Sequence, residues 1–506
     1  MKHLKFSLVL FILVLCAGSL RAEIPFKVVR GGQDTVYNKN HTLICITEPG
    51  NLAIINDTQV KVLPTGAFGI ELQLKEGDNT IEISLFKNKM REIREIYIYY
   101  SPNKPIVPEK TMTLSQARNI IDKSTLQERL LYVTSKEGAY LQYGDGDDRL
   151  GGSKISYVDT GIVFKVVGAI GDLYKVQLSQ NRFAYLPMEY AALSEKINST
   201  VNTGSWYVSN AGKYDRVRIS LPEKLPYSSW SELDPTTICL DIYGAMNNSN
   251  WITQMANLQE IDYVDLRQVE SDVLRVIIKM KNKYQWGYSV KYEGTNLVID
   301  VKHAPELSLR GMRIGLDAGH GGSASGAVGI TGVKEKDINL ALVRQVQRVL
   351  EEKGATVILS RQGDEDLTMT ERKKIFKDND IDLLLSIHNN AGGSALVSPG
   401  TSTYYKHLSN RDLAATMLNR LLEMGFSNYG LVGNFNFSLA APTEYPAVLL
   451  EVLFMSCIYD EAKLAEPANQ KMIAKQVLLG LEDYLTKVDE SMVNDNPKAK
   501  SKKKKR

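Results

Sequence analysis

The stretch AVLLEVLF at residues 447–454 is a run of apolar side chains interrupted by a single carboxylate, Glu451. An apolar run of this length without turn residues is typical of a buried β-strand. An ionised carboxylate inside such a strand is costly unless a nearby cation or a catalytic task compensates it. The stretch therefore predicts a strand that carries a functional group.

The segments that precede this strand alternate between strand and helix patterns. Strands are predicted at residues 312–316, 356–359 and 381–387, and helices at residues 337–352 and 411–424. Alternation of this kind favours an α/β domain with a mostly parallel sheet flanked by helices. Active sites of such sheets lie at the carboxyl ends of the strands. Residues that directly follow strands are therefore the first candidates for a site.

Two histidines occupy such positions. His320 follows the first strand in a glycine-dense turn, His388 directly follows the strand at 381–387, and Glu335 lies just before the helix at 337–352. A catalytic zinc ion is held by nitrogen or oxygen ligands from different segments and keeps one position open. Each residue alone has a simpler explanation, because a histidine after a strand usually only satisfies hydrogen bonds and a glutamate favours a helix start. From these residues alone, a zinc site and a set of unrelated polar groups are both open.

Four short motifs occur in order, and they are DAGHGG at residues 317–322, EKD at 335–337, SIHNNA at 386–391 and PAVLLE at 446–451. Together they closely resemble the zinc-dependent N-acetylmuramoyl-L-alanine amidase family. The resemblance is specific, because four separated motifs match with sensible spacing. It implies a zinc cofactor and hydrolysis of the amide bond between N-acetylmuramic acid and L-alanine in peptidoglycan, for cell-wall remodelling or daughter-cell separation.

Carried over residue by residue, the resemblance makes His320, Glu335 and His388 the zinc ligands and Glu451 the catalytic carboxylate. Bound zinc would activate a water molecule and polarise the scissile carbonyl. Glu451 would take the proton of that water and pass it to the departing amine of L-alanine.

This sequence departs from the family pattern at three positions outside these four residues. Ala318, Ala441 and Cys457 stand where relatives often carry Pro, Arg and Asn, so contacts to the substrate are expected to differ. Tightly controlled relatives carry a long insertion with a helix that covers the zinc. Here only residues 392–399 occupy that place, which is room for a turn. The catalytic domain, residues 308–487, is therefore expected to be open and active by itself on soluble peptidoglycan fragments.

Two other classes of function compete with this interpretation. A zinc carboxypeptidase would use the same ligands but would normally need an arginine for the substrate carboxylate, and no obvious one lies beside the motifs. An envelope-binding protein with an inactive amidase domain would usually have lost a ligand or the catalytic glutamate. Because all four residues are retained, the sequence favours the amidase.

Three β-rich modules are predicted ahead of the catalytic domain, because short apolar runs there alternate with turn signals. The first resembles immunoglobulin-like sandwiches, the second resembles bacterial Src-homology-3-like barrels, and the third weakly resembles modules that target amidases within the envelope. Binding to the wall or to envelope and division proteins is expected from these resemblances, and a spacer role stays open. The predicted division is a signal peptide at 1–22, a β-sandwich at 23–100, a linker at 101–129, a small β-barrel at 130–193, an envelope-targeting-like β-rich domain at 205–303, the zinc amidase domain at 308–487 and a basic disordered tail at 488–506.

The first 22 residues have the pattern of a secretory signal peptide. A basic start precedes an apolar stretch at residues 6–16 that is too short to span a bilayer. The mature chain is therefore expected in the periplasm or cell envelope, with no transmembrane segment of its own. Lipidation at Cys16 is a weaker alternative, because Leu15 stands where a small residue usually precedes a lipidated cysteine.

Charge and cysteine content exclude two further classes. Seven of the last nine residues are Lys or Arg, and without them the formal charge of +3 falls to −4, so no face for nucleic acid is indicated. Cys45, Cys239 and Cys457 lie far apart in apolar runs, which predicts buried thiols and excludes a cysteine metal site.

Overall fold

The computed structural model describes residues 23–104, 131–144, 154–197, 199–234, 236–249 and 251–495. The chain forms two compact units, Met1–Lys104 and Pro105–Arg506. The predicted signal peptide with Cys16, most of the predicted linker and the final residues of the predicted tail lie outside the described residues. Within the described ranges, no helix is long and apolar enough to cross a membrane.

The first unit is built from two sheets packed around a shared apolar core, which includes Leu43, Cys45, Phe68 and Ile83. Glycines with positive φ occupy its turns, for example Gly50. One sheet has the order β1-β3-β6 and the other the order β2-β8-β7-β4-β5. The strands are β1 (Lys27–Arg30), β2 (Thr35–Val36), β3 (Asn40–Ile46), β4 (Leu52–Ile55), β5 (Thr58–Val60), β6 (Ala67–Gln73), β7 (Gly77–Lys87) and β8 (Met90–Tyr100).

The second unit begins with a seven-stranded sheet of the order β11-β10-β14-β13-β12-β9-β15, here called the barrel. The alternating side chains of its strands bury Leu141, Phe164, Val176 and Leu186 in one core. Its two edge strands are β11 and β15. The strands are β9 (Leu131–Ser135), β10 (Tyr140–Gln142), β11 (Lys154–Tyr157), β12 (Val163–Ile170), β13 (Leu173–Ser179), β14 (Arg182–Pro187) and β15 (Ala191–Leu193), with the 3-10 turn η1 (Met188–Tyr190) before the last.

A middle domain follows, with sheets of the orders β22-β17-β18-β26-β25 and β19-β20-β24-β23 and a short β16-β21 pair. Its core contains the fully buried Val217, Ile242 and Leu274. The strands are β16 (Val201–Asn202), β17 (Trp206–Asn210), β18 (Tyr214–Ile219), β19 (Tyr227–Leu233), β20 (Thr236–Tyr243), β21 (Ala245–Met246), β22 (Ile252–Gln254), β23 (Ile261–Glu270), β24 (Val273–Met280), β25 (Tyr288–Glu293) and β26 (Asn296–Lys302).

The catalytic domain is a six-stranded sheet of the order β28-β27-β29-β32-β30-β31. The first four strands in this order run parallel, and β30 runs antiparallel to β32. The strand β32 coincides with the apolar stretch that contains Glu451, and all its residues are buried. The strands are β27 (Arg313–Ala318), β28 (Thr356–Leu359), β29 (Leu383–Asn390), β30 (Thr401–Tyr404), β31 (Asn428–Val432) and β32 (Ala447–Phe454).

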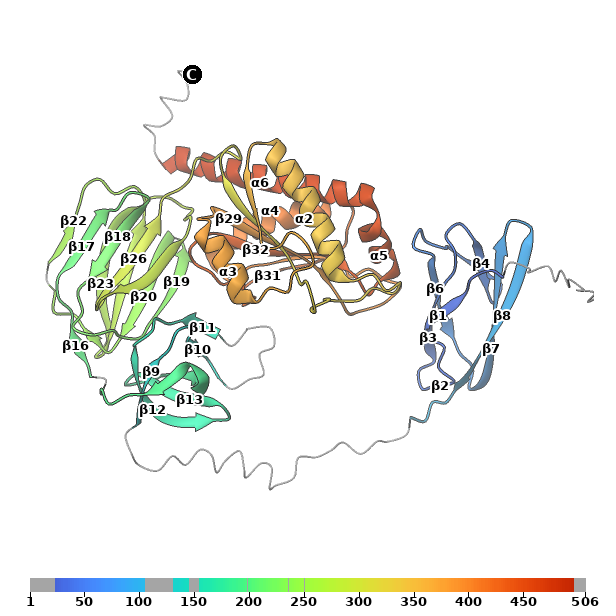
Figure 1. Cartoon of the computed structure of the whole chain (residues 1–506), viewed down its shortest axis with the longest axis horizontal. Coiled ribbons are helices and arrows are strands. Elements are labelled where there is room, and N and C mark those ends of the chain that lie inside the picture. Colours follow the sequence, from blue (N-terminus) through green and yellow to red (C-terminus); the bar gives the residue numbers. More distant parts are fainter. Residues whose placement is uncertain are drawn as a thin grey trace, which may run out of the picture. The chain divides into compact units, whose positions relative to one another are not determined.

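Helices cover the catalytic sheet unequally, as Figure 1 shows. Side chains of α2, α4, α5 and α6 form one large core with Leu316, Leu385 and Leu450 of the sheet. The opposite face has a smaller core, in which Phe376 of α3 packs on Leu384. The helices are α2 (Glu335–Glu352), α3 (Met369–Asp378), α4 (Arg411–Leu422), α5 (Ile458–Ala465) and α6 (Pro467–Asp495), and the 3-10 turn η2 (Leu408–Asn410) precedes α4.

The sequence correctly predicts a multidomain, strand-rich chain that ends in an α/β domain. Two element limits differ from the predicted ones. Helix α2 begins at Glu335 rather than at Asp337, because Lys334 already takes the extended conformation of an N-cap. Helix α6 continues to Asp495, so the segment after Lys487 is not a disordered tail from its start. The residue limits of the individual domains stay a prediction.

One segment of the middle domain belongs to the catalytic core as well. Tyr284 and Trp286, just before β25, are buried in the same apolar core as α2, α4 and α6. Both rings stand edge-on to Tyr484, at centroid distances of 6.0 and 6.2 Å. The Tyr284 hydroxyl donates a hydrogen bond to Asp412 of α4. The middle and catalytic domains therefore share packed side chains.

Candidate functional site

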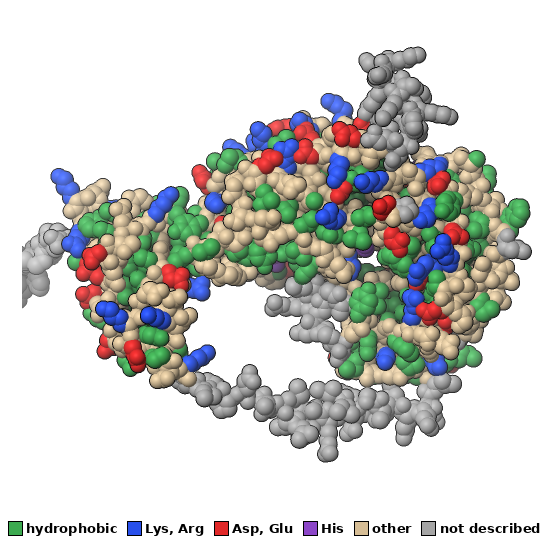
Figure 2. All heavy atoms as spheres, turned by 180° about the vertical axis from the view of Figure 1, so that it is seen from behind, with side chains coloured by type: hydrophobic (Ala, Val, Ile, Leu, Met, Phe, Trp, Pro, Cys, Tyr) green, Lys and Arg blue, Asp and Glu red, His purple; other side chains and the backbone are tan. Residues whose placement is uncertain are grey.

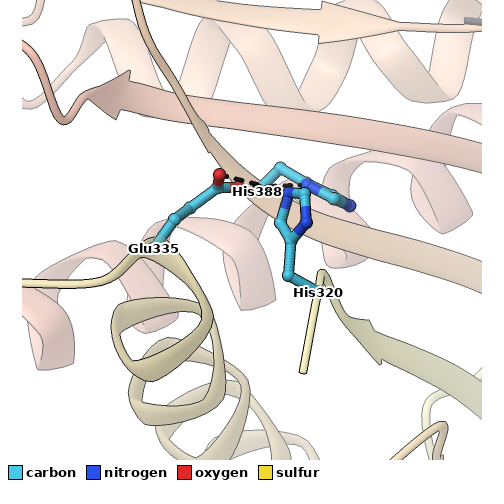
Figure 3. Close-up of side chains that lie close together, drawn as sticks. All are labelled: His320, Glu335 and His388. Atoms are coloured by element: carbon cyan, nitrogen blue, oxygen red, sulfur yellow. Dashed lines mark hydrogen bonds and ion pairs between the residues drawn. The ribbon is translucent and has the colours of Figure 1, made fainter. Parts of the chain in front are cut away.

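The structure brings the three predicted ligands together at the carboxyl ends of β27 and β29 and the start of α2. One donor atom from each of His320, Glu335 and His388 lies within 4.8 Å of the others, and the three residues could hold a metal ion. His320 Nε2 lies 3.2 Å from one carboxylate oxygen of Glu335, and His388 Nδ1 lies 3.1 Å from the other. Figure 3 shows the carboxylate and both imidazoles turned toward one another.

The glycines around the cluster make this close approach sterically feasible. A Cβ on Gly319 would lie 2.2 Å from the ring of His388, and a Cβ on Gly326 would lie 2.4 Å from the Glu335 carboxylate. His320 itself has a φ of 62°, which is uncommon for a residue other than glycine. Strained backbone of this kind is often found at functional sites.

Glu335 is held by partners that orient both of its oxygens. One oxygen accepts hydrogen bonds from the side chain of Asn339 and the backbone N–H of Asn389, both at 3.1 Å. The other accepts a bond of 2.8 Å from the backbone N–H of Ala327. Burial opposes ionisation of this carboxylate, but its hydrogen bonds to His320 and His388 outweigh burial and hold its pKa well below the usual value. Glu335 is therefore a fixed anion at the centre of the cluster.

Glu451 lies beside this cluster, because it pairs with His388 across the β29–β32 ladder. Its side chain is buried, and its Oε2 atom has no hydrogen-bond partner among the described residues. Burial is the largest cause that raises the pKa of Glu451, to about 7; the nearby His388 opposes the shift and the charge of Glu335 adds to it. A carboxyl group with a pKa near neutrality is suited to exchange protons in a reaction.

Buried charged groups that the sequence did not identify as part of a site support the turn around His320. Arg372 of α3 contacts Asp317 at 2.6 Å and donates to the backbone carbonyl of His320 at 2.6 Å. Arg361 donates to the carbonyls of Ala318 and Gly319 at 2.9 and 3.1 Å. Neither arginine lies in one of the four motifs, and their partners are distant in the chain, so no local pattern identified them.

Asn339 is a further residue that the sequence did not single out. It is fully buried, and it connects Glu335, the Gly319 carbonyl and the side chain of Asn389. It stands four residues after Glu335 on α2, which places both on one helix face. That spacing, together with the Asn389 of the histidine motif, was the available signal.

Aromatic side chains line the site beside Glu451. Tyr404 lies on β30 two residues after Ser402, and Ser402 pairs with Glu451 across the β30–β32 ladder. Phe435 and Phe437, from the loop after β31, stand against Tyr404 at centroid distances of 5.3 and 5.4 Å. The space-filling view shows histidine at the edge of the catalytic domain that faces the barrel (Figure 2).

The three cysteines, His407 and the segment 392–399 are not part of the cluster. Cys45, Cys239 and Cys457 are buried and free, as predicted. His407 is half-buried at a small cavity between the middle and catalytic domains, and its Nε2 lies 2.8 Å from the carbonyl of Ala441. Residues 392–399 contain no helix.

An α/β domain with a His–Glu–His cluster at its strand ends and a buried carboxyl beside it is compatible with a metal-dependent hydrolase. Comparison with known proteins narrows this class. A family model described as N-acetylmuramoyl-L-alanine amidase matches residues 314–483. The chain belongs to this family, which confirms the resemblance noted in the sequence.

Individual relatives match the same third of the chain. The Bacillus subtilis (strain 168) protein named Uncharacterized protein YqiI is 35% identical over 180 residues, which are 35% of this chain and 86% of that protein. Probable cell wall amidase LytH of Staphylococcus aureus is 33% identical over 195 residues, which are 38% of this chain and 65% of that protein. The catalytic domain of CwlV, an N-acetylmuramoyl-L-alanine amidase from Bacillus (Paenibacillus) polymyxa var. colistinus, is 33% identical with a TM-score of 0.33, covering 35% of this chain and 98% of that one. Family and relatives support hydrolysis of an amide bond in peptidoglycan.

Proposed function

We propose that this chain is a zinc-dependent N-acetylmuramoyl-L-alanine amidase. The bond cut is the amide between the lactyl group of N-acetylmuramic acid and L-alanine in peptidoglycan. One observation carries the proposal, namely that the donor atoms of His320, Glu335 and His388 lie within 4.8 Å of one another beside the buried carboxyl of Glu451.

The residues present fit a zinc ion. Two imidazoles and one carboxylate from three segments are a ligand set of catalytic zinc sites. The hydrogen bonds that Asn339 and Asn389 donate to Glu335 fix its orientation, as partners of metal ligands do. Zinc bound there supplies a Lewis acid that polarises the scissile carbonyl and makes water more acidic.

Glu451 is the proposed catalytic carboxylate. It accepts a proton from the attacking water and donates it to the nitrogen of L-alanine as the C–N bond breaks. Its burial supports both steps, because a pKa of about 7 allows either protonation state near neutral pH. The products are the muramic carboxylate and a peptide with a free amine.

The remaining parts of the chain suit an enzyme that acts outside the cytoplasm. We propose that the signal-peptide pattern directs export to the periplasm or cell envelope, where peptidoglycan lies. The three β-rich modules then place the catalytic domain on the wall or on envelope and division proteins, in cell-wall remodelling or daughter-cell separation.

The test is digestion of purified peptidoglycan with the mature protein, followed by mass spectrometry. We expect release of intact stem peptides with a free L-alanine amine. Chelation should abolish the release, and zinc should restore it. His320→Ala and His388→Ala should lose stoichiometric zinc, whereas the matched control His407→Ala should keep it. Full activity of metal-free protein, or cleavage at another bond, would refute the proposal.

A further inference from the structure

The loop between β31 and β32, residues 433–446, forms an aromatic wall on the Glu451 side of the site. Its Phe435 and Phe437 contact each other at a centroid distance of 4.5 Å, and both stand against Tyr404. Tyr404 lies on β30 two residues after Ser402, which pairs with Glu451. The position of this loop therefore determines the shape of the site next to the proposed catalytic carboxylate.

The middle domain fixes the end of the loop nearest β32. The backbone N–H of Tyr288 in β25 donates to the carbonyl of Thr443 at 2.7 Å. Gly287, with a φ of 108°, lies so close to Glu444 that a Cβ would stand 2.4 Å from its carbonyl. These contacts leave the loop little freedom at residues 443–445.

The barrel contacts the loop near its aromatic residues. Asn436, which stands between Phe435 and Phe437 and is 5% exposed, donates to the backbone carbonyl of Lys154 at 2.6 Å. The side chain of Ser438 lies beside that of Tyr157. Both barrel residues belong to the edge strand β11.

The same edge strand also reaches the other side of the site. Lys373 of α3 donates to the Tyr157 hydroxyl at 2.9 Å, and its Nζ lies 4.1 Å from the centre of the tyrosine ring. The preceding residue, Arg372, holds the carbonyl of His320. Figure 1 shows β11 beside α3. Strand β11 thus contacts both α3, which supports the turn at His320, and the loop that forms the aromatic wall.

The two kinds of contact differ in strength. The Asn436 side chain is buried. When it is removed, the Lys154 carbonyl loses its donor at a place that water reaches poorly. The Tyr157 side chain is 43% exposed, so water replaces part of its interaction when the hydroxyl is removed. Asn436 is therefore expected to matter more than Tyr157.

We propose that strand β11 of the barrel is a positioning element of the amidase, which holds the aromatic loop against Tyr404 through Asn436 and Tyr157. This inference rests on the proposed function for its substrate. The wall presents aromatic rings, which suit the methyl groups of the lactyl and alanine units on either side of the scissile bond. A preformed wall favours substrate binding, because less ordering is required when the substrate enters.

The first test measures the loop directly and needs no activity. Hydrogen exchange is followed in peptides from residues 433–446 of the mature protein and of Asn436→Ala and Tyr157→Phe. We expect exchange in this loop to rise about tenfold in Asn436→Ala and less in Tyr157→Phe, as local opening becomes easier. The matched controls are Asn419→Ala, an exposed position of α4, and Tyr132→Phe, in the barrel strand β9. Unchanged loop exchange in both loop variants would overturn the inference.

The second test separates positioning from catalysis. With a soluble muramoyl-peptide, Asn436→Ala should raise KM about fivefold while kcat stays within about twofold, because a contact made equally in ground and transition states is lost. Tyr157→Phe should shift KM in the same direction, and both controls should leave it unchanged. A fall in kcat with unchanged KM would overturn the inference. If the unmodified protein does not cut this substrate, the proposed function fails, and the exchange result still decides whether β11 holds the loop.

Discussion

Two buried carboxylates of the catalytic domain, Asp317 and Glu451, differ in their partners. This difference indicates a structural role for the first and a role in the reaction for the second. Asp317 is paired with Arg372 at 2.6 Å and accepts a hydrogen bond from Ser386 at 2.7 Å. Glu451 is also buried, yet one of its oxygens has no hydrogen-bond partner in the described part of the chain. A buried carboxyl with a free oxygen costs stability, so its presence next to a cluster that could hold a metal ion points to a task in the reaction.

Replacing Glu451 by glutamine tests that task at the residue scale. The amide has the same shape but cannot accept the proton, so turnover should fall by at least about 100-fold. Zinc should stay bound in a one-to-one ratio, because Glu451 is not among the three clustered donors. Both quantities are measured on purified protein, with Glu352→Gln on the exposed face of α2 as the matched control. Hydrolysis near the unmodified rate would show that another group carries the proton.

For Arg372 we expect a loss of stability, in contrast to the loss of turnover expected for Glu451. Arg372→Met fills much of the same space but leaves the buried Asp317 without its cation, which should lower the free energy of unfolding by about 3–5 kcal/mol. The turn at His320 should loosen as well, because its carbonyl loses a donor. Denaturant unfolding of the zinc-free and zinc-loaded protein measures both effects. Arg344→Met, on the exposed side of α2, should change the stability little.

At the scale of elements, sequence patterns located strands and helices well where burial is uniform. The strand at 447–454 was predicted with its correct limits because every residue in it is buried. The strand β27 was predicted only to Leu316 but extends to Ala318, since Asp317 is paired inside the protein by Arg372. A distant partner of this kind leaves no periodic signal near the strand.

Because distant partners leave no local signal in the sequence, only part of the site could be predicted. His320 and His388 follow predicted strands, Glu335 lies at a helix start and Glu451 interrupts an apolar run, so local patterns and family motifs single them out as candidates. The roles of Asn436 and Tyr157 depend on the barrel and the catalytic domain meeting in space. Contacts between segments so far apart in the chain follow from tertiary packing, which no local pattern encodes.

The junction between β18 and β23 yields a prediction about pH. Asp215 is fully buried and accepts bonds from the backbone N–H groups of Gln259, Glu260 and Ile261 and from His303. Burial alone would raise its pKa, but these hydrogen bonds outweigh burial and lower it. A depressed folded pKa contributes stability above the unfolded value of about 3.9, and this contribution is lost as the pH falls through the folded value.

Asp215→Asn should therefore destabilise the protein at pH 7 by about 1–3 kcal/mol, because the amide cannot accept all these bonds. The difference between the variant and the unmodified protein should shrink as the pH is lowered below about 4. Thermal unfolding at a series of pH values checks this, with the exposed Asp262→Asn as control. A difference that stays constant down to pH 3 would show that the charge of Asp215 contributes nothing.

At the scale of the whole molecule, side-chain contacts connect the barrel, the middle domain and the catalytic domain within the described part of the second unit. The barrel is tied to the middle domain by Arg182, which contacts Glu270 at 2.8 Å and Asp241 at 3.0 Å. The middle domain is tied to the catalytic domain by Lys302, which donates to the carbonyl of Ile381 at 2.7 Å. Such contacts would be lost in a fragment of residues 308–487, which the sequence predicts to be active by itself.

That expectation is revised, because the catalytic core includes side chains outside this range. Tyr284 and Trp286 precede residue 308, and the fully buried Val488 follows residue 487. A fragment of residues 308–495 restores Val488 but still lacks the two aromatic residues, whose removal leaves a cavity worth about 3–5 kcal/mol for each large side chain. Its thermal midpoint should lie at least about 10 °C below that of residues 131–495, and its activity on soluble fragments should be lower.

Within residues 131–495, Trp286→Ala should reproduce much of the loss, whereas Trp251→Ala, at a side chain that is 74% exposed, should not. Equal midpoints and equal activity of the two fragments would mean that the catalytic domain folds independently of these contacts, and that the barrel and middle domain act only by placing it on its substrate.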